Sequence, residues 1–502
     1  MHEHTVRATI ASGTIEGFTR GGVHRWRAIP YASAPVGSLR FRAPQPVQPW
    51  PGVRYCHSIG YCAPQQRMYT MLVPGRYQPT SEDCLTLNVV TPAVPSPDPL
   101  PVMVFIHGGG YMLGSSATPI YDGAALARKG CVYVSVNYRL GALGCLDLSS
   151  LSTPEHPIED NLFLRDLVMA LRWVRDNIAV FGGDPDNVTI FGESAGAHAV
   201  ATLLATPEAK GLFCQAIAQS PPSGMARGAD LAAEYARRFA AQLGVSESGA
   251  AAALMAARPT ELIAALERLI VQGQREMLGA FAIGPTWGTE YLPVDPIQAM
   301  RTGAAHRVPL IVGTNADEAR LFTRFLKLLP TTERSIERLF TQTEPDVRQR
   351  ITSVYPGYPS PAACVRLGGD FIFGSSIWQI APAHSKHVPT YVYRYDYAPP
   401  TLRWSGMGAT HATELFAVFD VYGSAVGKLL TAGVDARSAR RVTDDVQGRW
   451  LSFARSGVPK RDWPRYVPDE RAVLILDRRS RVEYDPHAER RLAWEAFAPA
   501  AH

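Results

Sequence analysis

Short apolar runs of strand length recur along this chain. Three of them fall within residues 101–106, 188–191 and 308–315. Runs of β-branched and other apolar residues at this length are typical of buried strands, because they are too short for a core helix. Each run is followed at once by small or polar residues. Candidate chemistry is therefore expected just beyond the ends of these strands.

The second run leads into Gly192-Glu193-Ser194-Ala195-Gly196, which precedes an alanine-rich stretch. A serine on a sharp turn between a strand and a helix holds strained backbone angles and exposes its hydroxyl. Side chains larger than glycine two positions away would collide with the neighbouring strand and helix. This pattern also arises by chance in long chains, so its surroundings decide its meaning. The strand–turn–helix context makes Ser194 a candidate nucleophile.

The first run leads into His107-Gly108-Gly109-Gly110. Consecutive glycines let backbone N–H groups turn toward a reacting carbonyl, and the amide of Ala195 at a helix N-terminus can join them. Such a loop favours an oxyanion hole, with an ordinary glycine-rich turn as the alternative. We interpret His107 itself as structural.

A serine nucleophile needs a general base and an acid that orients the base. In the fold that carries such a strand–turn–helix serine, they follow Ser in the order acid, then His. The third run leads to Asp317 and Glu318, and spacing alone does not choose between them. His411 lies among small residues that leave room for its ring, just before an apolar helix start, so it is the candidate base. A structural role for His411 is the alternative. The other histidines beyond the acid are His384, His387, His487 and His502.

Further motifs extend over nearly the whole chain: residues 29–32, 39–41, 81–88, 137–139, 170–174, 181–185, 313–318 and 453–459, with Trp463-Pro464. Together with the serine turn and the glycine loop, they make the chain resemble the type-B carboxylesterases of the α/β-hydrolase superfamily. That family also contains cholinesterases and bacterial para-nitrobenzyl esterases.

The resemblance implies an α/β-hydrolase fold: a central, mostly parallel, twisted sheet flanked by helices, with helical cap insertions. It implies a catalytic triad of Ser194 as nucleophile, His411 as base and Glu318, rather than Asp317, as acid. The oxyanion donors that it implies are the amides of Gly109, Gly110 and Ala195.

The chain departs from the family pattern near its substrate pockets. Residues 285–290 replace a usual Asp-Gly, and Ala319 follows Glu318 where glycine is usual. Ser220 resembles a serine that supports the histidine network, but two prolines follow it. None of these changes removes a catalytic group, yet the identity of the substrate is not carried over.

The segment between Cys62 and Cys84 contains no tryptophan, whereas cholinesterases place one there for a quaternary ammonium. Choline esters are therefore not expected to be preferred, and small to medium uncharged carboxylic esters are. The two cysteines match a disulfide-bonded loop of secreted relatives, but a cytosol would keep them as thiols.

Several charged residues are better explained by the scaffold or by tuning of the site. Glu193 either tunes the electrostatics of His411 or forms a wall of the pocket. We expect Glu318 and burial to offset each other and leave the pKa of His411 at about 6 to 7.

His198 is interpreted as a helix-face residue. Two pairs resemble structural ion pairs of the family, Arg40 with Glu82 and Arg139 with Asp166.

Composition favours one α/β domain over residues 1–502, with helical insertions around 226–280 and 320–350. A chain of 502 residues with 46% hydrophobic and 19% charged residues can bury a large core. Its net charge of +5 is modest for this length, and it has no basic stripe interleaved with aromatic residues. No nucleic-acid partner is therefore expected.

No early segment has the basic start, apolar core and cleavage site of a signal peptide. No run approaches the roughly 20 apolar residues of a membrane span, so we expect a cytoplasmic protein. The seven cysteines are scattered without metal-ligand spacing, and no phosphate loop or dinucleotide motif occurs. No metal and no cofactor are therefore expected.

These features predict a serine esterase that hydrolyses a small-molecule ester by two-step acyl transfer. An amide or carbamate hydrolase with the same triad is the nearest alternative. A non-catalytic cholinesterase-like binding protein is a more distant one, because the triad and the oxyanion loop are intact.

Overall fold

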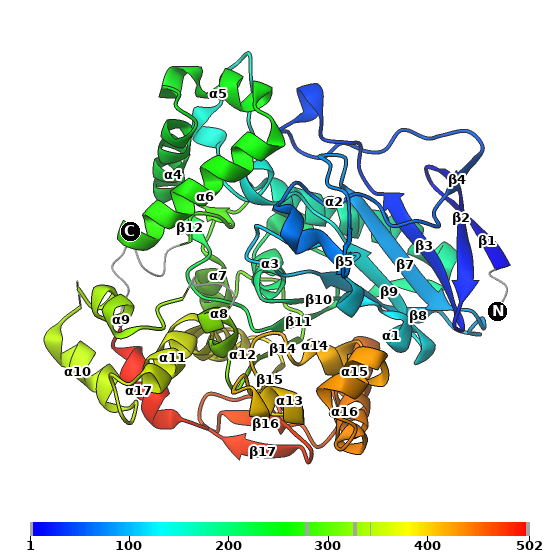
Figure 1. Cartoon of the computed structure of the whole chain (residues 1–502). Coiled ribbons are helices and arrows are strands. Elements are labelled where there is room, and N and C mark those ends of the chain that lie inside the picture. The colour runs from blue at the N-terminus through cyan, green and yellow to red at the C-terminus, as the bar shows by residue number, and fades with distance from the viewer. Residues whose placement is uncertain (1–3, 277–280, 325–328, 342, 498–502) are drawn as a thin grey trace.

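The computed structural model describes residues 4–276, 281–324, 329–341 and 343–497. One large sheet crosses the molecule from β1 near the N-terminus to β17 (Figure 1). In sheet order its strands are β1 (His4–Ile10), β2 (Gly13–Arg20), β3 (Val23–Pro30), β7 (Thr86–Pro92), β9 (Val132–Val136), β8 (Leu100–Ile106), β10 (Gly183–Glu193), β11 (Gln215–Gln219), β14 (Leu310–Asn315), β15 (Thr390–Tyr395), β16 (Ala472–Leu476) and β17 (Arg481–Tyr484). A short strand, β4 (Val53–Tyr55), pairs with β2.

The centre of this sheet, from β9 to β16, is parallel, and the strands toward its edges pair antiparallel, except that β4 pairs parallel with β2. The register aligns the carboxyl ends of the central strands. Gly192 of β10 pairs with Ile106 of β8, and Glu193 pairs with Gln219 of β11. Gln219 in turn pairs with Gly313 of β14. The residues that follow these strands are therefore brought together at one edge, where open α/β sheets bind their ligands.

Alternate side chains of the central strands pack into two hydrophobic cores, one on each face of the sheet. Along β8, Met103 and Phe105 belong to the core packed under α1 (Ala124–Arg128), α14 (Leu415–Val418) and α16 (Ala436–Ser456). Val104 and Ile106 belong to the opposite core, under α2 (Leu162–Asn177), α3 (Ala195–Leu203) and α12 (Ser375–Ser385). Burial on both faces explains the continuous apolar runs. The predicted α/β architecture is confirmed.

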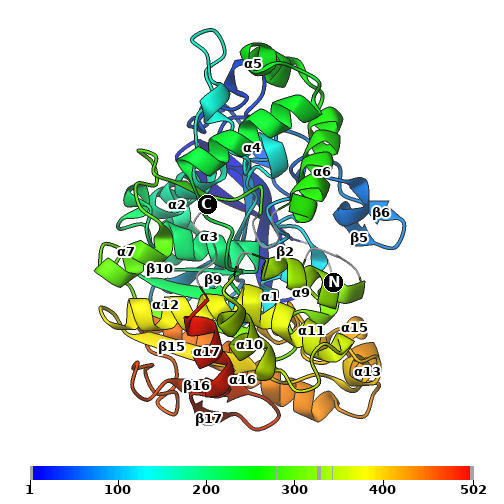
Figure 2. The ribbon, with the colours of Figure 1, turned by 90° about the vertical axis from the view of Figure 1, so that its left-hand side faces the viewer.

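Helices beyond the sheet layers form two groups on either side of α3 (Figures 1 and 2). One group contains α4 (Ala229–Gln242), α5 (Glu247–Ala256) and α6 (Pro259–Glu276). The other contains α8 (Arg320–Arg324), α9 (Glu333–Leu339), α10 (Pro345–Ser353) and α11 (Pro361–Gly369). The first group and α8, α9 and α10 occupy the segments around 226–280 and 320–350 that the sequence predicts to be helical, whereas α11 lies beyond the second segment. Residues 277–280, 325–328 and 342 lie outside the described residues. Their role as insertions of one domain stays a prediction.

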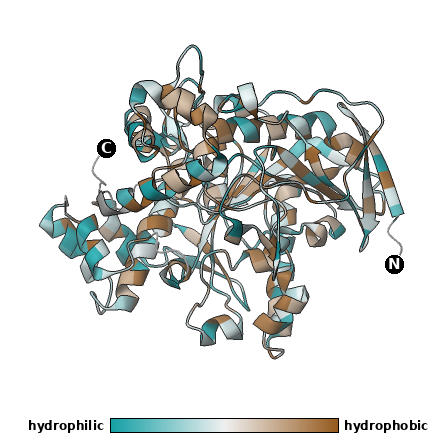
Figure 3. Cartoon of the chain, turned by 45° about the horizontal axis from the view of Figure 1, so that its top comes forward, coloured by the Kyte–Doolittle hydropathy of each residue, from teal (hydrophilic) through white to brown (hydrophobic). Residues whose placement is uncertain are grey.

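The remaining elements are short or lie near the C-terminus. Figure 3 shows brown residues gathered in the interior strands and teal ones prominent on the outermost helices. No helix within the described ranges is long and apolar enough to cross a membrane. The remaining helices are α7 (Pro296–Thr302), α13 (Pro400–Trp404), α15 (Ala425–Leu430) and α17 (Ala488–Glu495). Two small two-stranded sheets complete the fold, one of β5 (Met71–Val73) and β6 (Arg76–Tyr77), the other of β12 (Arg227–Gly228) and β13 (Thr286–Trp287).

The two expected structural ion pairs are both formed. Arg139 donates from Nε and Nη2 to the two oxygens of the fully buried Asp166, at 2.8 and 2.6 Å. Arg40 donates from Nε to Glu82 at 2.8 Å, and its Nη1 also reaches the carbonyl of Leu254 in α5. The N-terminal segment is thereby fastened to the α4–α6 group.

The cysteines that match the disulfide of secreted relatives, Cys62 and Cys84, are buried free thiols in this structure. Burial raises the pKa of the Cys62 thiol to about 12. The thiolate is therefore scarce at neutral pH.

Candidate active site

Ser194 occupies the turn between β10 and α3 with φ 58° and ψ −127°, a backbone conformation that L-residues rarely adopt. The flanking glycines are required by close packing. A Cβ on Gly192 would lie 2.6 Å from the backbone of Gly196, and a Cβ on Gly196 would lie 2.1 Å from the carbonyl oxygen of Ile106. The turn predicted from the five-residue pattern is therefore formed, and its strain holds the serine at the strand edge.

The glycine loop after β8 lies directly against this turn. A Cβ on Gly108 would come within 2.9 Å of Cβ of Ser194. Gly109 and Gly110 adopt φ values of 116° and 60°, which glycine adopts more readily than any other residue because it has no Cβ. Within the described ranges, the amides of Gly109, Gly110 and Ala195 donate to no protein acceptor. Three N–H groups are thus available beside the serine.

His411 and Glu318 meet at the same edge. The Nδ1 of His411 lies 2.6 Å from Oε2 of Glu318, and both side chains are buried. The other oxygen of Glu318 accepts from the backbone N–H of Asn315 at 2.6 Å and from the hydroxyl of Ser220 at 2.5 Å. Ser220 therefore supports the acid rather than the imidazole. Because a carboxylate only accepts, the proton on this side of the ring sits on Nδ1.

Asp317, the alternative acid, faces away from His411. Its carboxylate pairs with Arg320 at 2.7 Å and accepts from the amide of Ala409 at 3.2 Å. The geometry therefore places Glu318, and not its neighbour, against the candidate base.

The other histidines have structural partners. His384 and His387 bind the carbonyls of Val308 and Arg301 through Nε2, at 2.9 and 3.3 Å. His487 lies 3.8 Å from Glu489, and His502 is outside the described residues.

Glu193, next to the nucleophile, contacts the other nitrogen of His411. Its Oε1 lies 3.0 Å from Nε2 of His411, and only 3% of Glu193 is exposed. Among the hydrogen bonds of the described residues, none joins Ser194 Oγ to His411. The imidazole thus rests between two carboxylates in this structure.

Burial alone would lower the pKa of His411, but Glu193 and Glu318 outweigh burial and raise that pKa well above its usual value. This differs from the offset expected at the sequence level. That expectation included one carboxylate, whereas two face the ring.

Glu414 is a third buried carboxyl that sequence reasoning missed. It accepts from Gln219 Nε2 at 3.1 Å and from Asn315 Nδ2 at 2.6 Å, so Asn315 joins it to Glu318. Burial and the charges of Glu193 and Glu318 raise the pKa of Glu414 to about 8. Its position three residues after His411 could have indicated it, because one turn of chain brings residue 414 back to the same edge of the sheet.

Aromatic packing holds the His411 ring. The ring centroids of Phe322 and Phe373 lie 5.1 and 4.6 Å from it. Phe373 belongs to η8 (Asp370–Gly374), a π-helical turn between α11 and α12. Apolar rings on the imidazole limit its motion and its access to water.

His107 and His198 are buried and belong to the scaffold. His107 stacks on Tyr138 with ring centroids 4.6 Å apart, and burial lowers its pKa to about 4. His198 lies 3.0 Å from the hydroxyl of Tyr111, and burial lowers its pKa to about 3. Both rings are therefore neutral at pH 7, as structural histidines are.

An apolar cavity of about 340 Å³ adjoins the glycine loop, between residues 64–69, Met112 and Leu113, and α6. Gln65 fastens this region by a reciprocal pair of hydrogen bonds with the backbone of Gly114, both at 2.8 Å. The described residues contain no cluster of three metal-binding side chains. The strained serine, the buried carboxylate–imidazole pair and the three free amides at the strand edge are suited to acyl transfer.

Comparisons with known proteins identify the family of this chain. The model of the carboxylesterase family matches residues 3–494. This chain belongs to the carboxylesterase family. It is 37% identical over 497 residues to the para-nitrobenzyl esterase of Bacillus subtilis (strain 168), covering 96% of this chain and 97% of the relative. It is 32% identical over 493 residues to the phenmedipham hydrolase of Pseudarthrobacter oxydans, covering 93% of this chain and 94% of the relative.

Among solved structures, a para-nitrobenzyl esterase superposes with a TM-score of 0.85 at 35% identity, covering 97% of this chain and 99% of that one. The predicted α/β-hydrolase fold of this carboxylesterase-family member is thereby confirmed. The family and these esterase relatives establish it as a carboxylic ester hydrolase.

Proposed function

We propose that this enzyme is a serine carboxylesterase with Ser194 as nucleophile, His411 as general base and Glu318 as the acid that orients His411. The contact that carries the proposal is the 2.6 Å approach of Glu318 Oε2 to His411 Nδ1, at the strand edge where Ser194 stands on its strained turn. The oxyanion donors are the amides of Gly109, Gly110 and Ala195, whose N–H groups are free in the described part of the protein.

The reaction has two acyl transfers. Ser194 Oγ forms a bond to the ester carbonyl carbon, its proton passes to Nε2 of His411, and the amides hold the negative carbonyl oxygen. When this intermediate collapses, the bond to the alcohol breaks and the alcohol takes the proton from His411. Water then attacks the acyl group on Ser194 by the same route and releases the carboxylic acid.

Glu193 has a defined part in this cycle. Its oxygen 3.0 Å from Nε2 favours the positive imidazolium that forms each time the nucleophile is deprotonated. The same charge disfavours a carboxylate at the reacting centre, which supports small to medium uncharged esters as substrates. The apolar cavity beside the glycine loop suits an uncharged acyl or alcohol group.

The amide or carbamate alternative uses the same residues and differs only in its leaving group. A panel of p-nitrophenyl esters graded in acyl length, with matched p-nitroanilides and carbamates, distinguishes the two. We expect the esters to give the highest kcat/KM, and anilides or carbamates turned over faster than every ester would favour the alternative. An organophosphate should label Ser194 stoichiometrically, and a label on another residue would contradict the proposed nucleophile.

A further inference from the structure

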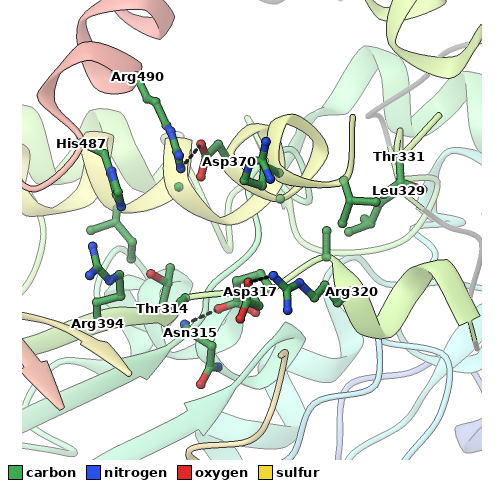
Figure 4. A pocket seen from close by; sticks show the side chains of 18 of the residues that line it. Thr314, Asn315, Asp317, Arg320, Leu329, Thr331, Asp370, Arg394, His487 and Arg490 are labelled. Carbon is green, nitrogen blue, oxygen red and sulfur yellow. Dashed lines mark hydrogen bonds and ion pairs between the residues drawn. The ribbon is translucent and has the colours of Figure 1, made fainter. Parts of the chain in front are cut away.

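A cavity of about 800 Å³ opens beside the turn that carries Glu318. Its lining includes residues 314–320 but neither Ser194 nor His411. The turn after β14 forms one wall, and α11, η8, α12 and the start of α17 contribute the others. In Figure 4, Arg394, His487 and Arg490 gather toward one end and Arg320, Leu329 and Thr331 toward the other. The size lies within the usual range of small-molecule sites, roughly 300 to 1,000 Å³.

Arginines outnumber acids in this lining, eight to four. Five of the eight form ion pairs, namely Arg320, Arg394, Arg471, Arg490 and Arg491. The other three form no ion pair within the ranges that the structure describes, and these are Arg324, Arg338 and Arg366. The hydrogen bonds of Arg324 and Arg366 go to backbone carbonyls, so neither guanidinium is held by a direct hydrogen bond to a carboxylate among the described residues, although the charge of Arg366 still acts on Asp317 and Asp370.

The end of the cavity near Arg490 also has a donor without a partner in the described part of the chain. Arg490 makes a 3.5 Å contact with Asp370, but its Nε is buried without a hydrogen-bond partner among the described residues. An unsatisfied buried donor is costly unless a ligand or water completes it. The lining also contains apolar side chains among its polar ones, and the larger of these are Leu329, Val365, Ile377, Trp378 and Val473.

We propose that this cavity binds a small carboxylate with an apolar tail, at a site separate from Ser194. Guanidinium groups match the planar, two-oxygen geometry of a carboxylate, and three of them here have no carboxylate partner. The apolar side chains of the lining account for the tail. A bare inorganic anion would leave them without a contact.

Two elements join this cavity to the catalytic histidine. Glu318 lies in the cavity lining and contacts His411 at 2.6 Å. The π-helical turn η8 places Asp370 and Gly374 in the lining and Phe373 against the His411 ring at 4.6 Å. A negative ligand here would raise the pKa of His411 further, because it favours the charged imidazolium. This coupling, unlike the binding itself, rests on the proposed role of His411 as base.

Calorimetric titration of the full-length enzyme with octanoate tests the binding. We expect Arg366→Gln and Arg338→Gln each to weaken octanoate at least about tenfold, because each removes a charge-assisted contact. Arg440→Gln, an exposed arginine of α16 outside the cavity, is the matched control and should bind like the wild type. Octanamide, which lacks the charge, should bind more weakly than octanoate. Equal octanoate binding by all variants, or no binding at millimolar concentration, would overturn the proposal.

Ester hydrolysis with and without octanoate tests the coupling. Octanoate should move the acid limb of the kcat profile of the wild type to higher pH and leave the profile of Arg366→Gln in place. A competitor at Ser194 would instead raise KM and leave kcat unchanged. If hydrolysis shows this competitive pattern while calorimetry shows that Arg366→Gln weakens octanoate binding, the coupling is overturned and the binding site is not. An inactive enzyme that still shows arginine-dependent binding would contradict the proposed function and not the cavity.

Discussion

Asp317 and Glu318 are neighbours on one turn, yet they face two opposite electrostatic environments. Glu318 points to a buried imidazole that Glu193 also contacts, and its side chain is 5% exposed. Asp317 points to Arg320 at the arginine-rich cavity, and its side chain is 25% exposed. Because the two side chains point in opposite directions, this turn separates the acidic surroundings of His411 from the arginine-rich cavity.

The comparison shows how charge is organised at this strand edge. Glu193 and Glu318 place negative charge against the buried His411 and raise its pKa, whereas Glu414 beyond them has a pKa raised to about 8 and is neutral at pH 7. On the other side of the turn, arginines exceed acids. Substitutions that affect one side and spare the other test whether the two are functionally distinct.

Loss of the nucleophile should have the largest effect. Ser194→Ala should lower kcat by about 10⁴ to 10⁶, because the members of a triad act as a unit. Steady-state hydrolysis of a p-nitrophenyl ester measures this. The cavity should be spared, so calorimetry with octanoate should give the same affinity as the wild type. Near-normal turnover in the folded variant would refute the assignment.

Exchanging each neighbouring acid for its amide tests the two sides directly. Glu318→Gln should lower kcat by about 10³ to 10⁴, because the amide no longer holds the correct tautomer of His411. Asp317→Asn, its matched control, should change kcat by less than about tenfold, since it removes only a partly exposed ion pair. The reverse ranking would show that the functional acid is Asp317.

Glu193→Gln should change the pH dependence more than the maximal rate. With His411 as the proposed base, activity should rise with pH through the pKa of His411, which lies above the ordinary value in the wild type. Removing the negative charge of Glu193 lowers that pKa, and the acid limb of kcat/KM should move to lower pH by about one unit or more. Glu208→Gln, an exposed acid paired with Arg172, is the control. An unmoved acid limb would mean that Glu193 does not act on the base.

Glu414→Gln should alter stability rather than chemistry. The pKa of Glu414 rises from 4.5 to about 8 on folding, so the folded state holds a proton that the unfolded state releases. Stability from this group is complete below pH 4.5 and is lost as pH rises toward 8. The neutral glutamine should remove that loss, which amounts to at most about 1.4 kcal/mol per pH unit. Urea unfolding at several pH values measures it, and parallel curves for both proteins would disprove the expectation.

The sequence predicts the parts of the site that depend on local geometry. The turn around Ser194 and the loop at residues 107–110 could be inferred because each requires glycine at particular positions of the backbone. Burial on both faces similarly made the central strands recognisable. Asp317 and Glu318 could not be separated by spacing, since their side-chain directions depend on Arg320 and His411, one near and one distant in the chain.

Contacts between distant segments account for what the sequence left open. Glu193 was recognised as a candidate to tune His411, but its position on Nε2 follows from how the end of β10 meets the distant loop that carries His411. Glu414 depends on Gln219 and Asn315, which lie far from it in sequence. The arginine-rich cavity draws on several helices, so no single stretch of sequence indicates it.

The left-handed backbone of Ser194 implies a trade of stability for reactivity. Only glycine adopts φ 58° and ψ −127° without a steric penalty, so every other residue at this position strains the folded protein by about 1 to 3 kcal/mol. Ser194→Gly should therefore produce an inert protein with a higher melting temperature than Ser194→Ala. The most reactive residue of the fold would then be one of its weakest points against heat, and an engineered gain in thermal tolerance has to come from elsewhere in the molecule.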